Sequence, residues 1–129
     1  MPLERINPPT LVETGGNYHH VVKDGNTVYL AGQVGCDKDG NLAGDAAGQI
    51  EQTFKNIQSA LTFAGSDMRH IMKMTVYITH MEDFPTFATI RAKYIPDYMT
   101  HTPAGTFILV AGLASPAMRI ELDIIASIP

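Results

Sequence analysis

The chain has 129 residues and a formal net charge of −4, with 45% hydrophobic and 17% charged residues. This length holds one domain with a real core but not two, and the composition argues against disorder, so we expect a single folded domain over residues 1–129. Lysine and arginine form no cluster that could neutralise phosphates or lipid headgroups, so we expect neither nucleic acid nor a membrane as a partner.

The N-terminal part predicts an irregular lead-in and then a β-hairpin. The first sixteen residues contain three prolines and end in Gly15-Gly16. Two β-prone runs follow, residues 19–22 and 27–31. Asp24-Gly25 between them is a favoured hairpin turn, because both residue types tolerate positive φ. A turn-rich stretch over residues 37–44 then leads into the next element.

Residues 45–64 have the pattern of an amphipathic helix. Ile50, Phe54, Ile57 and Leu61 recur at spacings of four and three, which places them on one face. Gly65 is typical of a helix C-terminus. We therefore predict a helix over residues 45–64 that buries this face.

Residues 72–79 alternate between apolar and polar side chains. The period of two predicts a strand with one buried face, formed by Met72, Met74, Val76 and Ile78. The methionines are interpreted as core filling rather than as cofactor contacts.

A second helix is predicted to begin at Asp83, which offers an N-cap, with Pro85 tolerated in the first turn. Pro96 would cost about 3 kcal/mol inside a helix, so we expect the helix to break near Tyr94–Ile95.

The last two predicted strands complete a mixed sheet. Residues 106–111 are apolar on both faces, whereas residues 118–125 alternate between apolar and charged side chains. The order strand, strand, helix, strand, helix, strand, strand predicts an α/β (α+β) fold with two helices packed on one face of a single mixed sheet. The doubly apolar strand predicts that a copy of the chain covers the other face.

Short motifs spread along the chain carry a resemblance that runs from Gly16 to Ala126. The matching residues are Tyr18, Ala31-Gly32-Gln33, Gln52, Thr53, Asn56, Ala64-Gly65, Lys73, Thr75, Val76, Asp83-Phe84, Pro103-Ala104, Ala111 and Glu121. Each motif is short, but their joint order and spacing resemble the RidA/YjgF family, which is also labelled endoribonuclease L-PSP.

The resemblance implies a chorismate-mutase-like YjgF architecture and a homotrimer whose three ligand clefts lie between subunits. In family members that hydrolyse imines, an arginine in a Pro-Ala-Arg-Ser/Thr strand clamps the substrate carboxylate. A glutamate on the final strand positions the attacking water. The glutamate position is Glu121 here, but the arginine position is Gly105. Ala88 stands where the family often has asparagine, and Arg91 where it often has tyrosine.

These matches and departures give the candidate site. We predict Glu121 as the catalytic residue, since a carboxylate within hydrogen-bond reach can orient water. Its alternative role is a strand residue paired with Arg119 or with a neighbour across the sheet. The predicted substrate-binding residues are Tyr18, His19, Ala31, Gly32, Phe87, Ala88, Arg91, Gly105, Thr106 and Phe107. Tyr18 would stack on a planar ligand or hydrogen-bond to it; otherwise it is a partly buried aromatic beside the hairpin.

Loss of the clamp arginine at Gly105 leaves two interpretations open. Its fork to a carboxylate would contribute on the order of 1.5–3 kcal/mol. Another cation could replace it, with Arg91 the leading candidate ahead of His19 and His101, although Arg91 could equally be a surface arginine. Alternatively, the ligand lacks a carboxylate there and is bulkier, which we favour because an arginine-to-glycine change empties volume as well as charge.

No motif predicts a metal or a cofactor. His19 and His20 are neighbours on a predicted strand, so their side chains point to opposite faces and cannot share one ion. Glycine-rich nucleotide-binding loops do not occur. The single Cys36 is interpreted as an inert loop thiol, because the adjacent Asp37 raises its pKa. One cysteine, and an opening segment without an apolar core, predict a cytoplasmic protein without a signal peptide.

The favoured function is binding of a small metabolite between subunits, with hydrolysis of an imine, an enamine or a related electrophile through Glu121. The rival is a non-catalytic ligand-binding or interaction protein that lost deaminase activity with the arginine. RNA cleavage, suggested by the older family label, is disfavoured by the acidic charge balance.

Overall fold

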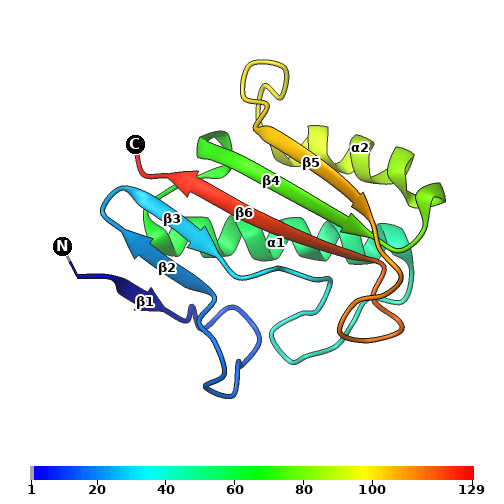
Figure 1. Cartoon of the computed structure of the whole chain (residues 1–129), viewed down its shortest axis with the longest axis horizontal. Coiled ribbons are helices and arrows are strands. Elements are labelled where there is room, and N and C mark those ends of the chain that lie inside the picture. The colour runs from blue at the N-terminus through cyan, green and yellow to red at the C-terminus, as the bar shows by residue number, and fades with distance from the viewer. Residues whose placement is uncertain (1) are drawn as a thin grey trace.

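The computed structural model describes residues 2–129, and Met1, the first residue of the predicted domain, lies outside that range. Six strands form one mixed sheet in the order β1-β2-β3-β6-β4-β5, and α1 and α2 cover one of its faces (Figure 1). The predicted architecture is therefore confirmed. The elements are β1 (Glu4–Ile6), β2 (Val21–Asp24), β3 (Thr27–Leu30), α1 (Ala46–Ala64), the short 3-10 helix η1 (Met68–His70), β4 (Ile71–Ile78), the 3-10 helix η2 (Met81–Asp83), α2 (Phe84–Tyr94), β5 (Ala104–Leu109) and β6 (Ile120–Ser127).

The N-terminal segment differs from the predicted irregular lead-in. Residues 4–6 form β1, which pairs antiparallel with β2, with Arg5 opposite Val22. This edge strand has only partial burial and no alternating pattern, so its position depends on β2 rather than on its own sequence. The predicted β2–β3 hairpin is present, and Gly25 has a φ of +59° in its turn.

Helix α1 follows its sequence pattern closely. The Asp45 carboxylate accepts a hydrogen bond from the Gly48 backbone N–H at 2.7 Å and caps the N-terminus. Gly65 closes the C-terminus with a φ of +89°. The predicted apolar face is buried, with Phe54 and Ile57 fully inaccessible to solvent.

Strand β4 departs from the predicted alternation at its start. A register shift between Ile71 and Lys73 inserts one extra residue opposite β6, so Ile71 takes the core position. Met72 is 43% exposed as a result, and its predicted core role is wrong, whereas Met74 is buried as predicted.

Helix α2 begins and ends where the prolines predict, with Pro85 in the first turn and Tyr94 as the last residue. Asp83 occupies the predicted N-cap position, but its side chain caps no helix N–H. The buried Asp83 carboxylate instead accepts hydrogen bonds from Arg119 Nε at 2.9 Å and Nη2 at 3.0 Å. This bidentate pair fixes the start of α2 to the segment that enters β6.

The two last strands differ in how well the chain covers them. In β6, Ile120, Leu122 and Ile124 are buried under the helices, as predicted. β5 pairs parallel with β4 at the sheet edge and is largely exposed, with Ile108 at 37%. The predicted cover on both faces is thus not supplied by residues 2–129 of one chain. No helix in those residues combines the length and the apolar character needed to cross a membrane.

Candidate functional site

Strand register separates the predicted site residues into two groups on opposite faces of the sheet. Gly105 lies opposite the buried Met74 on β4, so it belongs to the helix-covered face. Glu121 lies opposite Tyr77 and alternates with the buried residues of β6, so it belongs to the other face, called here the open face. One chain therefore holds Glu121 and Gly105 on opposite sides of its sheet.

The Glu121 side chain is partly buried on the open face. Among residues 2–129, no hydrogen bond or ion pair involves its carboxylate. Burial, and secondarily the neighbouring Asp123, raise its pKa above the usual value for glutamate. The alternative pairing with Arg119 is not present, because that guanidinium binds Asp83 and, at 3.5 Å, Glu82. Glu121 is a carboxylate with acceptor capacity left free.

Gly32 makes this position of Glu121 sterically feasible. A Cβ atom placed on Gly32 would lie 2.3 Å from Glu121 Oε2 and 2.8 Å from its Cδ, far inside van der Waals contact. The next residue, Gln33, exchanges two backbone hydrogen bonds of 2.9 Å with Leu122, which fixes this segment beside β6. The carboxylate therefore lies directly against the backbone of Gly32.

A buried polar network holds Tyr18 near the same corner of the sheet. His20 Nε2 donates to the Val12 carbonyl at 2.7 Å, which leaves Nδ1 to accept from the Gln33 side-chain amide at 3.2 Å. The same amide donates to the Ala31 carbonyl at 3.1 Å. The rings of Tyr18 and His20 form a T-shaped pair at a centroid distance of 5.5 Å, and Tyr18 is 46% exposed. Part of the Tyr18 side chain is therefore accessible to a ligand.

His19 is exposed whereas His20 is buried, as expected for neighbours that point to opposite sides. The sequence predicted no role for His20 beyond the rejected metal pair with His19, since nothing in its spacing indicates a buried hydrogen-bond network.

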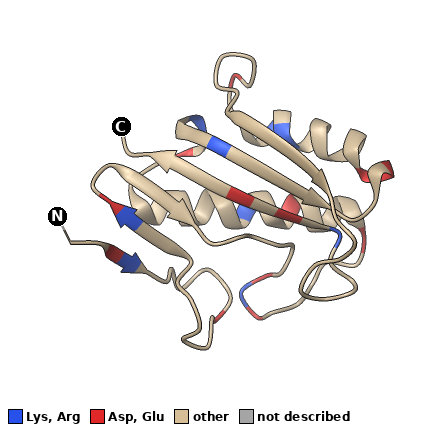
Figure 2. Cartoon of the chain, in the orientation of Figure 1, with Lys and Arg blue, Asp and Glu red and all other residues tan. Residues whose placement is uncertain are grey.

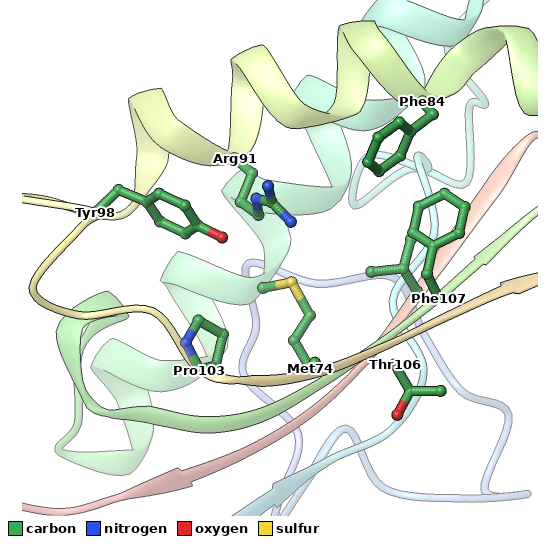
Figure 3. A pocket seen from close by; sticks show the side chains of 9 residues that line it. Met74, Phe84, Arg91, Tyr98, Pro103, Thr106 and Phe107 are labelled. Carbon is green, nitrogen blue, oxygen red and sulfur yellow. The ribbon is translucent and has the colours of Figure 1, made fainter.

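A cavity of about 260 Å³ lies on the helix-covered side, between α2 and the β4–β5 pair (Figure 3). It is lined by Met74, Val76, Phe84, Arg91, Tyr98, Pro103, Gly105, Thr106 and Phe107. The cavity thus brings together four predicted binding residues: Arg91, Gly105, Thr106 and Phe107. A Cβ atom on Gly105 would meet nothing closer than the Met74 carbonyl oxygen at 4.0 Å.

Arg91 extends from α2 into this cavity beside Tyr98 (Figure 3). Its guanidinium carbon lies 4.8 Å from the Tyr98 ring centroid and 5.2 Å from that of Phe87. Its Nε atom is buried and has no hydrogen-bond partner among the described residues.

The remaining predicted residues occupy supporting or distant positions. Phe87 is fully buried and packs against Phe54 and Phe107, and neither it nor the partly buried Ala88 is among the described residues that line the cavity. The Thr106 side chain points away from the cavity (Figure 3), and its hydroxyl accepts a hydrogen bond from Lys73 Nζ at 2.7 Å. Sequence reasoning missed Tyr98, which follows α2 in an irregular loop without any motif.

Within residues 2–129, His, Cys, Asp and Glu side chains form no group of three or more that could hold a metal ion. Cys36 lies in a loop, where partial burial and the adjacent Asp37 raise its pKa. A raised pKa disfavours the reactive thiolate, in agreement with the predicted inert thiol.

Comparisons with known proteins identify relatives over nearly the whole chain. The endoribonuclease L-PSP family model matches residues 10–128. A 2-iminobutanoate/2-iminopropanoate deaminase of Dermatophagoides farinae is 29% identical over 129 residues, covering 98% of both chains. The protein mmf2, mitochondrial, of Schizosaccharomyces pombe is 31% identical over 116 residues, covering 88% of this chain and 89% of its own.

The fold is also that of a solved structure with a bound small molecule. The structure of Escherichia coli TdcF with bound serine superposes with a TM-score of 0.87 at 25% identity, covering 96% of this chain and 98% of that one. The family match and the shared fold confirm the resemblance drawn from the sequence motifs. The chain belongs to the endoribonuclease L-PSP family, also called RidA/YjgF.

Proposed function

We propose that the protein hydrolyses small imines or enamines in clefts between copies of the chain, with the Glu121 carboxylate positioning the attacking water. The observation that carries this proposal is the carboxylate itself, which is partly buried, lies against Gly32 and has no partner within residues 2–129. The name of the mite relative, an iminobutanoate and iminopropanoate deaminase, supports the substrate class.

The chemistry needs one group that accepts and then returns a proton. Glu121 would hold a water beside the imine carbon and accept its proton as the carbon–oxygen bond forms and the C=N π electrons move to nitrogen. Glu121 returns this proton to the nitrogen, which gives a neutral carbinolamine. It then accepts the carbinolamine hydroxyl proton and passes it to the nitrogen as the C–N bond breaks, so that ammonia leaves and a carbonyl product forms. Water and imine are thus converted to ammonia and a ketone or an aldehyde. A raised pKa brings Glu121 closer to the operating pH, which suits a group that works in both directions.

The proposed cleft requires more than one copy of the chain. Glu121 and the cavity beside Gly105 lie on opposite faces of the sheet, so a neighbouring copy that covers the open face would have to bring them together. The open face carries exposed apolar side chains, including Tyr29 at 45%. We take the assembly to be the homotrimer that the family resemblance implies. Sedimentation as a monomer would contradict it.

The direct test is Glu121→Gln, which keeps the size of the side chain but removes the proton acceptor. Ammonia release from imines generated in situ by an amino-acid oxidase should fall by at least about a hundredfold. Asp123→Asn is the matched control, since it removes the other carboxylate on the same face of β6. Equal losses in the two variants, or none in Glu121→Gln, would remove Glu121 from the mechanism.

A non-catalytic binding protein is the second candidate, favoured by the glycine in place of the clamp arginine. It predicts binding of amino-acid-derived ligands without any ammonia release. RNA cleavage is disfavoured because basic residues are scattered over the chain rather than gathered (Figure 2). A steep salt dependence of RNA binding would revive it. Cytoplasmic localisation stays a prediction, since one relative is named as mitochondrial.

A further inference from the structure

We propose that Arg91 of α2 binds the carboxylate of the ligand inside the α2–β5 cavity, and that this ligand is a small organic acid with an apolar, preferably aromatic, body. The clamp would then come from the helix, across the cavity from the strand position that Gly105 occupies. This inference rests on the proposed function only in taking the cavity as the place of the substrate.

Arg91 has unsatisfied hydrogen-bonding capacity. A guanidinium carries five N–H donors and stays charged, so a buried donor without an acceptor is costly. Its Nε is buried and unpartnered among the described residues, and none of the residues lining the cavity is acidic. Nε itself lies out of reach of solvent, so an anion in the cavity would meet the terminal N–H groups of Arg91 and balance its positive charge among the apolar walls.

Two aromatic rings already restrict the position of the Arg91 guanidinium. Its carbon atom Cζ lies over the Phe87 ring at 5.2 Å and over the Tyr98 ring at 4.8 Å from the centroids. Contacts with two aromatic rings restrict the rotamers of the arginine side chain before a ligand binds. Less side-chain freedom is therefore lost when a carboxylate binds.

The rest of the cavity is largely apolar and has free space beside Gly105. The edge-to-face pair of Phe84 and Phe107, at a centroid distance of 4.7 Å, forms one apolar wall together with Val76. The cavity has free space beside Gly105, because a Cβ atom on this residue would lie no closer than 4.0 Å to any other atom. The volume of about 260 Å³ lies near the lower end of the range for ligand pockets, about 300–1,000 Å³, which suits a small metabolite. Apolar walls with a single cation select an acid with a branched or aromatic body.

The experiment measures binding without turnover. Isothermal titration calorimetry compares phenylacetate with its neutral analogue phenylacetamide and with acetate, which has the charge but no apolar body. The intact protein should bind phenylacetate at least about tenfold more tightly than either analogue. Equal affinity for phenylacetamide would overturn the role of the charge, and equal affinity for acetate would overturn the role of the apolar walls.

Two substitutions assign the charge to Arg91. Arg91→Met should weaken phenylacetate binding on the order of tenfold to a hundredfold, and Arg91→Lys should weaken it less. Lys38→Met is the control, because it removes the same charge from an exposed loop residue. Circular dichroism verifies that each variant is folded. Wild-type affinity in folded Arg91→Met, or an equal loss in Lys38→Met, would refute the inference.

The result is independent of catalysis. If Arg91 proves necessary for binding while no imine is ever hydrolysed, the inference stands and the proposed function fails. If Glu121→Gln abolishes hydrolysis while Arg91→Met binds phenylacetate normally, the proposed function stands and the inference fails.

Discussion

Gly32→Ala tests whether the position of the Glu121 carboxylate matters for activity. The added Cβ would lie 2.3 Å from Glu121 Oε2, whereas ordinary van der Waals contacts of Cβ atoms begin near 3.4 Å. The carboxylate must therefore move by roughly 1 Å, and a misplacement of that size can cost on the order of a hundredfold in rate. The backbone at Gly32 has no positive φ that would exclude alanine.

Stability should change far less than activity in this variant. The three atoms nearest to the added Cβ all belong to the flexible Glu121 side chain, and none of them is a backbone atom. We expect the free energy of unfolding to change by less than about 1 kcal/mol. Ammonia release from imines and chemical denaturation measure the two effects separately.

Gly112→Ala is the matched control, since a Cβ there meets nothing within 4 Å. In a Glu121→Ala background, Gly32→Ala should have no further effect, because the side chain that it displaces is gone. A Gly32→Ala variant with the wild-type rate would refute the reasoning, as would an equal loss in Gly112→Ala.

Three further predictions concern pH, stability and assembly. Because its pKa is raised, Glu121 loses its charge at a higher pH than an ordinary glutamate, so the acid limb of the pH–rate profile should lie above the usual glutamate range. In Asp123→Asn this acid limb should shift to lower pH, because one cause of the raised pKa is removed. An acid limb that does not shift would show that another group controls it. Asn56→Ala removes side-chain hydrogen bonds of 3.0 Å and 2.8 Å to the carbonyls of Val34 and Cys36. It should lower the free energy of unfolding by about 1–3 kcal/mol, measured by chemical denaturation. An unfolding free energy equal to that of the wild type would contradict this prediction. Ile108→Lys places a charge on the open face and should lower the sedimentation coefficient by dissociating the assembly, whereas Lys38→Met should not.

Much of the fold follows from local sequence patterns. The buried face of α1, its glycine stop and the Asp24-Gly25 hairpin each depend on residues a few positions apart. β1 and the displaced Met72 were missed because both depend on distant partners, β2 in one case and the register against β6 in the other. A short edge strand or an extra residue in a strand leaves little trace in its own segment.

In the candidate site too, local patterns predicted some features, whereas others depend on contacts between distant segments. Alternation in the last strand assigned Glu121 to the face away from the core, as observed. The contact between Gly32 and Glu121 could not be predicted, because it depends on how the segment after β3 approaches β6. Asp83 shows a related ambiguity: a carboxylate before a helix can cap that helix or bind a distant cation, and only the position of Arg119 decides between them.

The separation of Glu121 and Arg91 on opposite faces of one sheet has a consequence that can be measured in mixed assemblies. If each site joins Glu121 of one copy to Arg91 of its neighbour, then Glu121→Gln and Arg91→Met chains that are assembled together regain intact sites. In a ring of randomly mixed copies, about a quarter of the interfaces would hold both wild-type groups. Activity at low imine concentration should then rise to about a quarter of the wild-type value, well above either parent. Activity no higher than the mean of the two parents would show that both groups act within a single chain, or that only one of them acts at all.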